Sequence, residues 1–310
     1  MKSFCISLLI VFSISVSSQD STYLEKEISI SKWIDGTLLI PKDISKPDLA
    51  IIIAGSGPTN RNGNQNFMKN NTLKKLAIAL GQNRIASFRY DKRVVKQIRQ
   101  GNIDKNTMFD DFVTDATDVI SFFQADENFN KLIVIGHSQG SLVGILAAKD
   151  RADGFVSLAG AGQNIGNVIA DQISKTAPMF KSDTDRIISS LKKGETTTDY
   201  PQALSSVFNL ELQPFMINWM QYDPTEEIKK LKIPALLVNG TKDLQVPVEE
   251  AEMLQQAQPS SELRIIENMN HVLFEIKGDE LENAKSYNES QRPISTKLIE
   301  SITNFVQKLN

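Results

Sequence analysis

Residues 132–140 (LIVIGHSQG) constrain the fold of this chain more than any other stretch. The first four residues are apolar and three of them are β-branched, which predicts a buried strand. The strand runs into the pentapeptide GHSQG, and residues 141–149 (SLVGILAAK) then have the composition of a helix. The pattern is G-x-S-x-G between a strand and a helix, which is the context of a nucleophile elbow.

The elbow predicts a specific role for three of its residues. Gly136 and Gly140 lie two positions before and after the serine, where a tight turn leaves no room for a side chain. Ser138 would then stand at the start of a helix, where backbone N–H groups favour developing negative charge. The alternative is a glycine-rich turn whose serine only caps the helix.

Length and charge limit the classes of protein to consider. A chain of 310 residues with 41% apolar content can form one large α/β domain with an insertion. The net charge is −3, and no basic stripe with interleaved aromatic residues is present, which argues against a nucleic-acid partner.

The N-terminus has the pattern of a signal peptide over residues 1–18. Lys2 precedes an apolar segment (4–16), and Val16-Ser17-Ser18 resembles a small-residue cleavage site. The apolar segment is short for a membrane span, so we expect no stable membrane insertion after cleavage. The sequence therefore predicts an exported protein, periplasmic or secreted; the alternative is an N-terminal anchor.

Strands alternate with helices along most of the remaining chain, which predicts an α/β fold with a mostly parallel sheet covered by helices. The segment 163–227 lacks a convincing strand and predicts a helical cap inserted after the sixth strand, between core segments 19–162 and 228–310. The order of elements resembles the α/β-hydrolase fold. Strands are expected at 25–30, 34–40, 49–54, 85–90, 132–135, 153–159, 234–238 and 263–266, and core helices at 71–81 (ending at Gly81), 107–124, 141–149, 249–256 and 294–309.

A serine nucleophile needs a base, and the chain has only two histidines. His137 is next to Ser138 in the elbow, where the turn directs its side chain away from the serine. His271 follows the last predicted strand and is therefore the expected base. Asp243 follows an apolar strand and is the expected acid, which gives the order Ser138, Asp243, His271. Glu249 and Glu250 are the alternatives, but both lie in a predicted helix.

The oxyanion hole is expected to combine two backbone N–H groups. One is that of Gln139, directly after the serine, and the other comes from the loop after the third strand. Gly57 is the first choice in that loop and Ser56 the second. The glycines at 55–57 and 160–166 do not complete a phosphate-loop signature, although the second set has some likeness to a dinucleotide site. With two histidines and one cysteine, in the signal segment, we expect no metal and no cofactor.

Residues 55–64 (GSGPTNRNGN) resemble the GSGPTDRDGN signature of EstD-type bacterial carboxylesterases, α/β-hydrolases related to the serine aminopeptidase group. Four further segments match in the same order, namely residues 89–93 (RYDKR), 136–140, 240–243 (GTKD) and 270–271 (NH). The resemblance implies an esterase for short acyl chains with Ser138, Asp243 and His271 as its triad. Asn60 and Asn62 replace two aspartates, and Val94-Val95 replaces the residues that usually follow the arginine. These departures bear on substrate preference and leave the triad unchanged.

The sequence thus predicts a serine hydrolase acting on a small-molecule ester. Ser56, Phe215 and Trp219 are candidate pocket residues; the aromatic and methionine residues of the cap would line an acyl pocket or form the cap's own core. An amidase, an aminopeptidase or an acyltransferase would use the same triad. A non-catalytic binding protein is the alternative from another class. The sequence leaves the substrate and the oligomeric state open.

Overall fold

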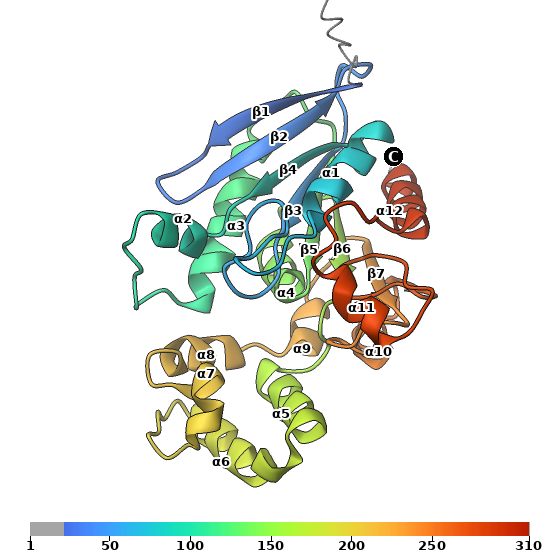
Figure 1. Ribbon diagram of the computed structural model, residues 1–310. Coiled ribbons are helices and arrows are strands. Elements are labelled where there is room, and N and C mark those ends of the chain that lie inside the picture. The colour runs from blue at the N-terminus through green and yellow to red at the C-terminus, as the bar shows by residue number, and fades with distance from the viewer. Residues whose placement is uncertain (1–21, 310) are drawn as a thin grey trace, which may run out of the picture.

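An eight-stranded sheet forms the centre of the computed structural model, which describes residues 22–309 (Figure 1). The predicted signal peptide lies outside the described residues. The strand order is β1-β2-β4-β3-β5-β6-β7-β8. The strands are β1 (Tyr23–Ser29), β2 (Asp35–Pro41), β3 (Leu49–Ile53), β4 (Ala86–Tyr90), β5 (Leu132–His137), β6 (Gly154–Leu158), β7 (Ala235–Gly240) and β8 (Glu262–Ile266).

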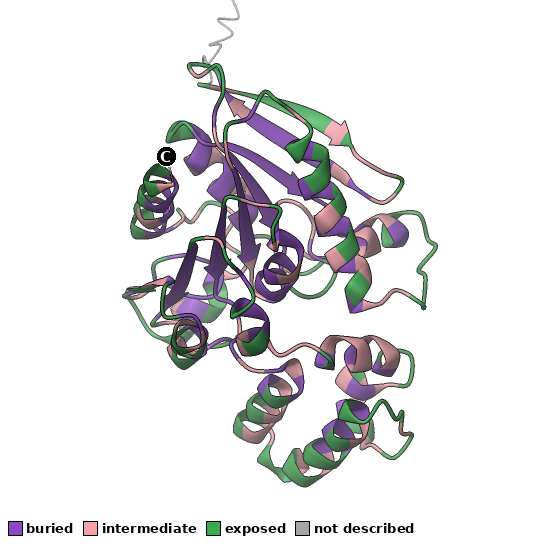
Figure 2. Cartoon of the chain, turned by 180° about the vertical axis from the view of Figure 1, so that it is seen from behind, coloured by how far each residue is buried: buried purple, intermediate pink, exposed green. Residues whose placement is uncertain are grey.

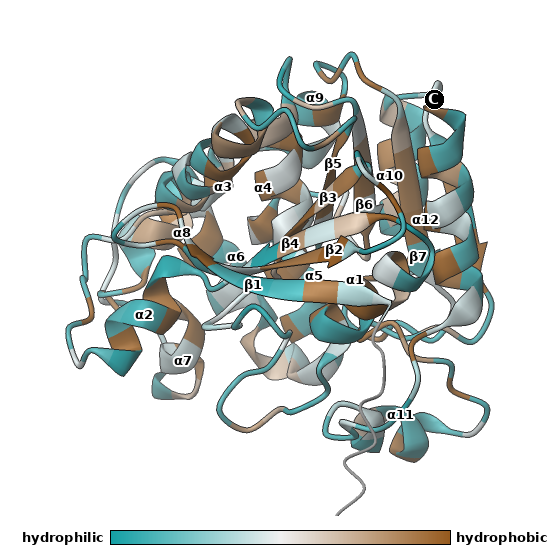
Figure 3. Ribbon diagram, turned by 90° about the horizontal axis from the view of Figure 1, so that it is seen from above, coloured by the Kyte–Doolittle hydropathy of each residue, from teal (hydrophilic) through white to brown (hydrophobic). Residues whose placement is uncertain are grey.

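The sheet is mostly parallel, as predicted. β2 pairs antiparallel with both β1 and β4, and every other neighbouring pair is parallel. All residues of β3 and β6 are buried, whereas β1 at the edge is mostly exposed. Figure 3 shows the same contrast, with hydrophobic central strands and a largely hydrophilic β1. Central strands are continuously apolar because helices cover both of their faces.

The helices cover the two faces of the sheet in separate sets. α1 and α12 pack on one face, and α3, α4 and α10 pack on the other. The helices are α1 (Thr72–Gln82), α2 (Arg93–Arg99), α3 (Phe109–Gln124), α4 (Gln139–Ala148), α5 (Ile165–Thr176), α6 (Lys181–Lys192), α7 (Ser205–Phe208), α8 (Gln213–Met220), α9 (Pro224–Ile228), α10 (Val248–Ala257), α11 (Glu280–Ser286) and α12 (Thr296–Lys308), with short 3₁₀ turns at Pro178–Phe180 and Gln202–Leu204.

Two details differ from the sequence prediction. Gly81 does not end its helix: it lies inside α1, where a Cβ would come within 2.4 Å of the Leu39 side chain. Its role is therefore close packing of the helix on the sheet. The short helices α2 and α11 were not predicted. No helix among residues 22–309 is long and apolar enough to cross a membrane.

The insertion between β6 and β7 is helical, as predicted, and α5 to α8 form a cap at one end of the sheet (Figure 1). The cap has a small hydrophobic core of its own, and its outward faces are exposed (Figure 2). α9 returns to the main domain, where Ile228 is fully buried in the main core. The buried residues of the cap core are Ile187, Ile188, Leu191, Leu204, Phe208, Met216 and Met220.

Candidate active site

Four predicted site residues follow the carboxyl ends of parallel strands. Ser56 follows β3, Ser138 follows β5, Asp243 follows β7 and His271 follows β8. Carboxyl ends of parallel strands lie at one edge of a sheet, which is where ligands bind in open α/β sheets. The fold therefore brings together residues that are distant in the sequence.

The serine lies on a strained turn, as the motif predicts. Ser138 has φ 54° and ψ −122°, between the end of β5 and the start of α4. A Cβ on Gly136 would lie 2.2 Å from the carbonyl oxygen of Gly140, and a Cβ on Gly140 would lie 2.5 Å from that of Ile53. Strain of this kind is stored at functional sites at a cost of about 1–3 kcal/mol per residue.

His271 and Asp243 form a buried hydrogen-bonded pair. The Nδ1–H of His271 donates to Oδ2 of Asp243 at 2.8 Å, since a carboxylate can only accept. Oδ1 of Asp243 accepts from the backbone N–H groups of Gln245 (2.8 Å) and Val246 (2.9 Å). With its proton on Nδ1, the neutral His271 ring keeps a free lone pair on Nε2. That is the tautomer a general base requires.

The alternative acid Glu250 has other partners. Its Oε2 accepts from the backbone N–H groups of Gly162 (2.7 Å) and Gln163 (2.8 Å), where the chain enters the cap. Glu250 therefore anchors the start of the cap. The loop after β7, and not the helix behind it, supplies the carboxylate that contacts His271.

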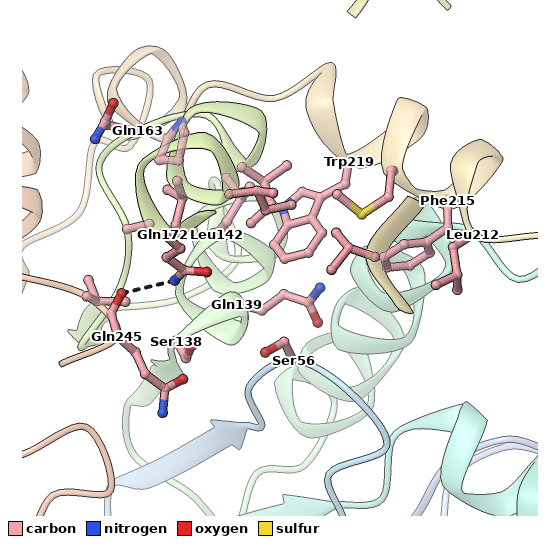
Figure 4. Close-up of a pocket in the computed structure, with 18 of the residues that line it drawn as sticks. Ser56, Ser138, Gln139, Leu142, Gln163, Gln172, Leu212, Phe215, Trp219 and Gln245 are labelled. Carbon is pink, nitrogen blue, oxygen red and sulfur yellow. Dashed lines mark hydrogen bonds between the residues drawn. The ribbon is translucent and has the colours of Figure 1, made fainter. Parts of the chain in front are cut away.

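Ser138 lies at the junction of two cavities. The smaller, the histidine cavity, has a volume of about 60 Å³ and is lined by Ser138, His271 and mostly polar neighbours such as Thr59, Gln65 and Tyr287. The larger, the cap cavity, has a volume of about 480 Å³ and extends from Ser138 to the cap (Figure 4). It is lined mainly by apolar residues of α4, α5 and α8, including Leu142, Ile165, Val168, Ile169, Phe215, Met216 and Trp219.

The three candidate pocket residues all line the cap cavity. Trp219 stacks on Phe109 of α3, with ring centroids 5.4 Å apart and planes 3° apart, so this wall is fixed to the main domain. Across the cavity, Nε2 of Gln172 donates to the carbonyl oxygen of Gln245 (Figure 4). Both interpretations of the apolar cap residues apply, because Phe215 and Trp219 line the cavity whereas Phe208 and Met220 are buried in the cap core.

The loop after β3 presents Ser56, and not Gly57, to the cavities. Ser56 lines both cavities and Gly57 lines neither; Gly57 has φ +73° and faces Gln65. Among the described residues, the N–H groups of Ser56, Gly57 and Gln139 all lack a hydrogen-bond partner, so the lining of the cavities is what distinguishes Ser56 from Gly57. Two free N–H groups beside Ser138 are what an oxyanion hole requires. The second candidate in this loop therefore fits the geometry better than the first.

His137 has a role that the sequence did not predict. Its Nε2–H donates to the backbone carbonyl of His271 at 2.8 Å, which connects the elbow to the histidine loop. Burial, together with the neighbouring His271 ring, lowers the pKa of His137 to about 4. The ring is thus neutral at pH 7 and keeps the proton that this hydrogen bond needs.

The His137 pKa predicts how stability depends on pH. The native state takes up this proton near pH 4, whereas the unfolded chain takes it up near pH 6.5. We therefore expect the free energy of unfolding to fall as the pH decreases from about 6.5 to about 4. Urea unfolding across this range would measure it. In His137→Gln, whose amide can donate to the same carbonyl but does not titrate, the fall should be smaller; an identical fall would contradict the assignment.

The GSGPTNRNGN loop is held by charged residues outside the cavities. Arg61 donates to Asp91 through its backbone N–H (2.8 Å), Nε (3.2 Å) and Nη2 (2.9 Å), and Asp91 also accepts from Arg99. Within the loop, Oδ1 of Asn60 accepts hydrogen bonds from the backbone N–H groups of Asn62 and Asn64. This loop and the RYDKR segment thus form one network that supports Ser56. Among residues 22–309, no cluster of histidine, cysteine or acidic residues could hold a metal.

The sheet order and the serine elbow after β5 define the α/β-hydrolase class. The model of one family within this class, the serine aminopeptidases (S33), matches residues 69–276. The match covers more than half of the chain, and the chain therefore belongs to the serine aminopeptidase (S33) family. The predicted fold and superfamily are confirmed.

Individual relatives are distant. The chain is 24% identical over 268 residues to Esterase EstD of Thermotoga maritima, covering 83% of this chain and 62% of that protein, so it spans less than two thirds of that relative. The structure of Est1E from Butyrivibrio proteoclasticus superposes with a TM-score of 0.60 and 17% identity, covering 92% of this chain and 98% of that one. The Pyrococcus furiosus esterase Pf2001 gives a TM-score of 0.55 and 14% identity over 97% and 95%. Likeness at this level shows the fold.

Proposed function

We propose that this protein is a serine hydrolase that cleaves small carboxylic esters through an acyl-enzyme. The observation that carries the proposal is that Ser138, on its strained turn, lines the same cavity as His271. Asp243 in turn accepts the hydrogen bond from Nδ1 of that histidine. A serine hydroxyl is a weak nucleophile unless a base activates it, and a base oriented by a carboxylate is the arrangement that does so.

In this mechanism, Nε2 of His271 takes the Ser138 proton as the serine oxygen attacks the ester carbonyl. The backbone N–H groups of Gln139 and Ser56 would stabilise the oxyanion, and His271 would then protonate the departing alcohol. A water molecule activated by the same histidine would hydrolyse the acyl-enzyme. Asp243 would stabilise the imidazolium that forms in both steps.

The two cavities suggest how an ester would lie. The leaving alcohol must be on the His271 side, because His271 protonates it, and His271 lines the small histidine cavity. The acyl group would then occupy the larger, apolar cap cavity. We therefore propose substrates with a small alcohol and an apolar acyl group. Two relatives are consistent with an ester, since EstD is named an esterase and Est1E has a structure with ferulic acid bound to it.

An aminopeptidase is less well supported, although the family is named for that activity. Its substrate carries an ammonium group beside the scissile bond, and a desolvated cation needs a carboxylate partner. Among the described residues that line the two cavities, none is aspartate or glutamate. An amidase for uncharged substrates and an acyltransferase would use the same geometry, and the experiment below separates them.

The test is hydrolysis of methyl esters from acetate to palmitate, followed through the acid released, with a second series in which the alcohol varies from methyl to benzyl. We expect turnover that falls for long acyl chains and for bulky alcohols. A fluorophosphonate probe should label Ser138, as mass spectrometry of the labelled peptide would show. No turnover and no labelling would favour a non-catalytic protein; labelling without ester turnover would direct attention to amides and to acyl acceptors other than water.

We also propose that the protein is exported, to the periplasm or out of the cell. This proposal rests on the sequence pattern of residues 1–18 alone.

A further inference from the structure

Lys92 carries a buried amine next to the site, and the mechanism above does not use it. The residue is 6% exposed. Nζ donates to the carbonyl oxygen of Gly55 (3.0 Å) and to Oε1 of Gln139 (2.8 Å), and it lies 4.2 Å from the centroid of the Phe112 ring.

No carboxylate compensates for this burial. Among the described residues Lys92 makes no ion pair, and the nearby Asp115 is paired with Arg93. Burial lowers the pKa of Lys92 to about 7. A buried amine without a charged partner is costly, and an apolar side chain would fill the same space at less cost. Such a cost is typically tolerated at functional sites.

The two acceptors of Lys92 belong to the two loops of the oxyanion hole. Gly55 shares a peptide unit with Ser56, and in a trans peptide the carbonyl and the N–H point in opposite directions. Holding the Gly55 carbonyl against Lys92 therefore directs the Ser56 N–H away from Lys92. Ser56 and Ser138 line the same two cavities. The second hydrogen bond holds the side chain of Gln139, whose own N–H is the other donor.

We propose that Lys92 is a positioning residue that fixes the two oxyanion-hole N–H groups relative to each other, through Gly55 on one side and Gln139 on the other. This inference rests on the proposed function. It predicts that loss of Lys92 affects the transition state, where the oxyanion exists, more than the bound substrate.

The test is Lys92→Met, which keeps the length of the side chain but removes both hydrogen bonds. We expect kcat for a short-chain ester to fall about 10- to 100-fold with KM nearly unchanged. Removing one oxyanion donor costs about 10²–10³ in kcat, and here both donors remain but are less well placed. Affinity for a trifluoromethyl ketone, which forms a tetrahedral oxyanion on the serine, should fall by a similar factor. A purely structural role would not lower kcat and the affinity for the ketone by the same factor.

Lys75→Met is the matched control. Nζ of Lys75 also donates to a backbone carbonyl, that of Arg292, and lies 4.3 Å from the centroid of the Phe274 ring, but away from the oxyanion loops. We expect its kcat to stay within about twofold of wild type. Thermal unfolding of both variants would show whether each is folded at the assay temperature.

Gln139→Met removes the other end of the contact and keeps the backbone N–H. We expect it to lower kcat as well, and the double variant to lose little more than Lys92→Met alone, because coupled residues are not additive. If Lys92→Met does not fold, Gln139→Met tests the same contact. Unchanged kcat in either folded variant, with an active wild type, would overturn the role of Lys92 alone. A wild type with neither ester turnover nor fluorophosphonate labelling would overturn the proposed function and this role together.

Discussion

Replacing Ser138 by alanine is expected to lower kcat for ester hydrolysis by about 10⁴- to 10⁶-fold and to abolish labelling by a fluorophosphonate. The proposed acyl-enzyme forms on the serine oxygen, which alanine lacks. The fold should be unaffected. Alanine and serine both carry a Cβ, so the strained backbone at φ 54° costs nearly the same for either residue. The measurement is steady-state turnover of a short-chain ester with the thermal unfolding midpoint beside it.

Ser141→Ala is the control for this experiment. Ser141 is buried in α4, which Ser138 precedes, and its hydroxyl hydrogen-bonds to that of Ser157 at 2.7 Å, outside the cavities. We expect a modest loss of stability, about 1 kcal/mol, and little change in kcat. If Ser138→Ala kept a tenth or more of the wild-type kcat, hydrolysis would proceed without the elbow serine and the proposed mechanism would be wrong.

The sequence predicted the sheet and the position of each site loop because these depend on strong, local patterns. Continuous apolar runs specify β3, β5, β6 and β7 wherever both faces are covered, and glycines at fixed distances from Ser138 specify the turn. The rarity of histidine left His271 as the main candidate for the base. Short polar helices such as α11 (ELENAKS) have no comparable pattern.

The supporting residues could not be predicted, because their contacts join distant segments. His137 reaches a carbonyl 134 residues away, and Lys92 reaches Gln139 across 47. The sequence alone favours Gly57 over Ser56, because glycine lets the backbone approach a substrate closely. Loop spacing could not show that Ser56, and not Gly57, lines the cavities. The one signal for Lys92 is its position two residues after Tyr90, where a buried strand ends.

Asp243→Asn is expected to lower kcat by about 10⁴-fold near pH 7, although it changes a single atom type. The reason lies in how the carboxylate is held. Oδ1 accepts two backbone hydrogen bonds, from Gln245 and Val246, and only an oxygen can accept them. In the asparagine variant the amide oxygen must stay at that position, so the NH₂ group faces Nδ1 of His271.

This orientation would force the wrong tautomer on His271. An NH₂ group donates, so Nδ1 would become an acceptor and the proton would move to Nε2, which then could not take the Ser138 proton. Asp223→Asn is the matched control, because Oδ1 of Asp223 also accepts two backbone hydrogen bonds, at the start of α9, but contacts no histidine. We expect its kcat to be close to that of wild type. Equal losses in the two variants would mean that Asp243 acts only by stabilising its loop; a loss confined to Asp243→Asn, with unchanged unfolding, would assign it to the orientation of the base.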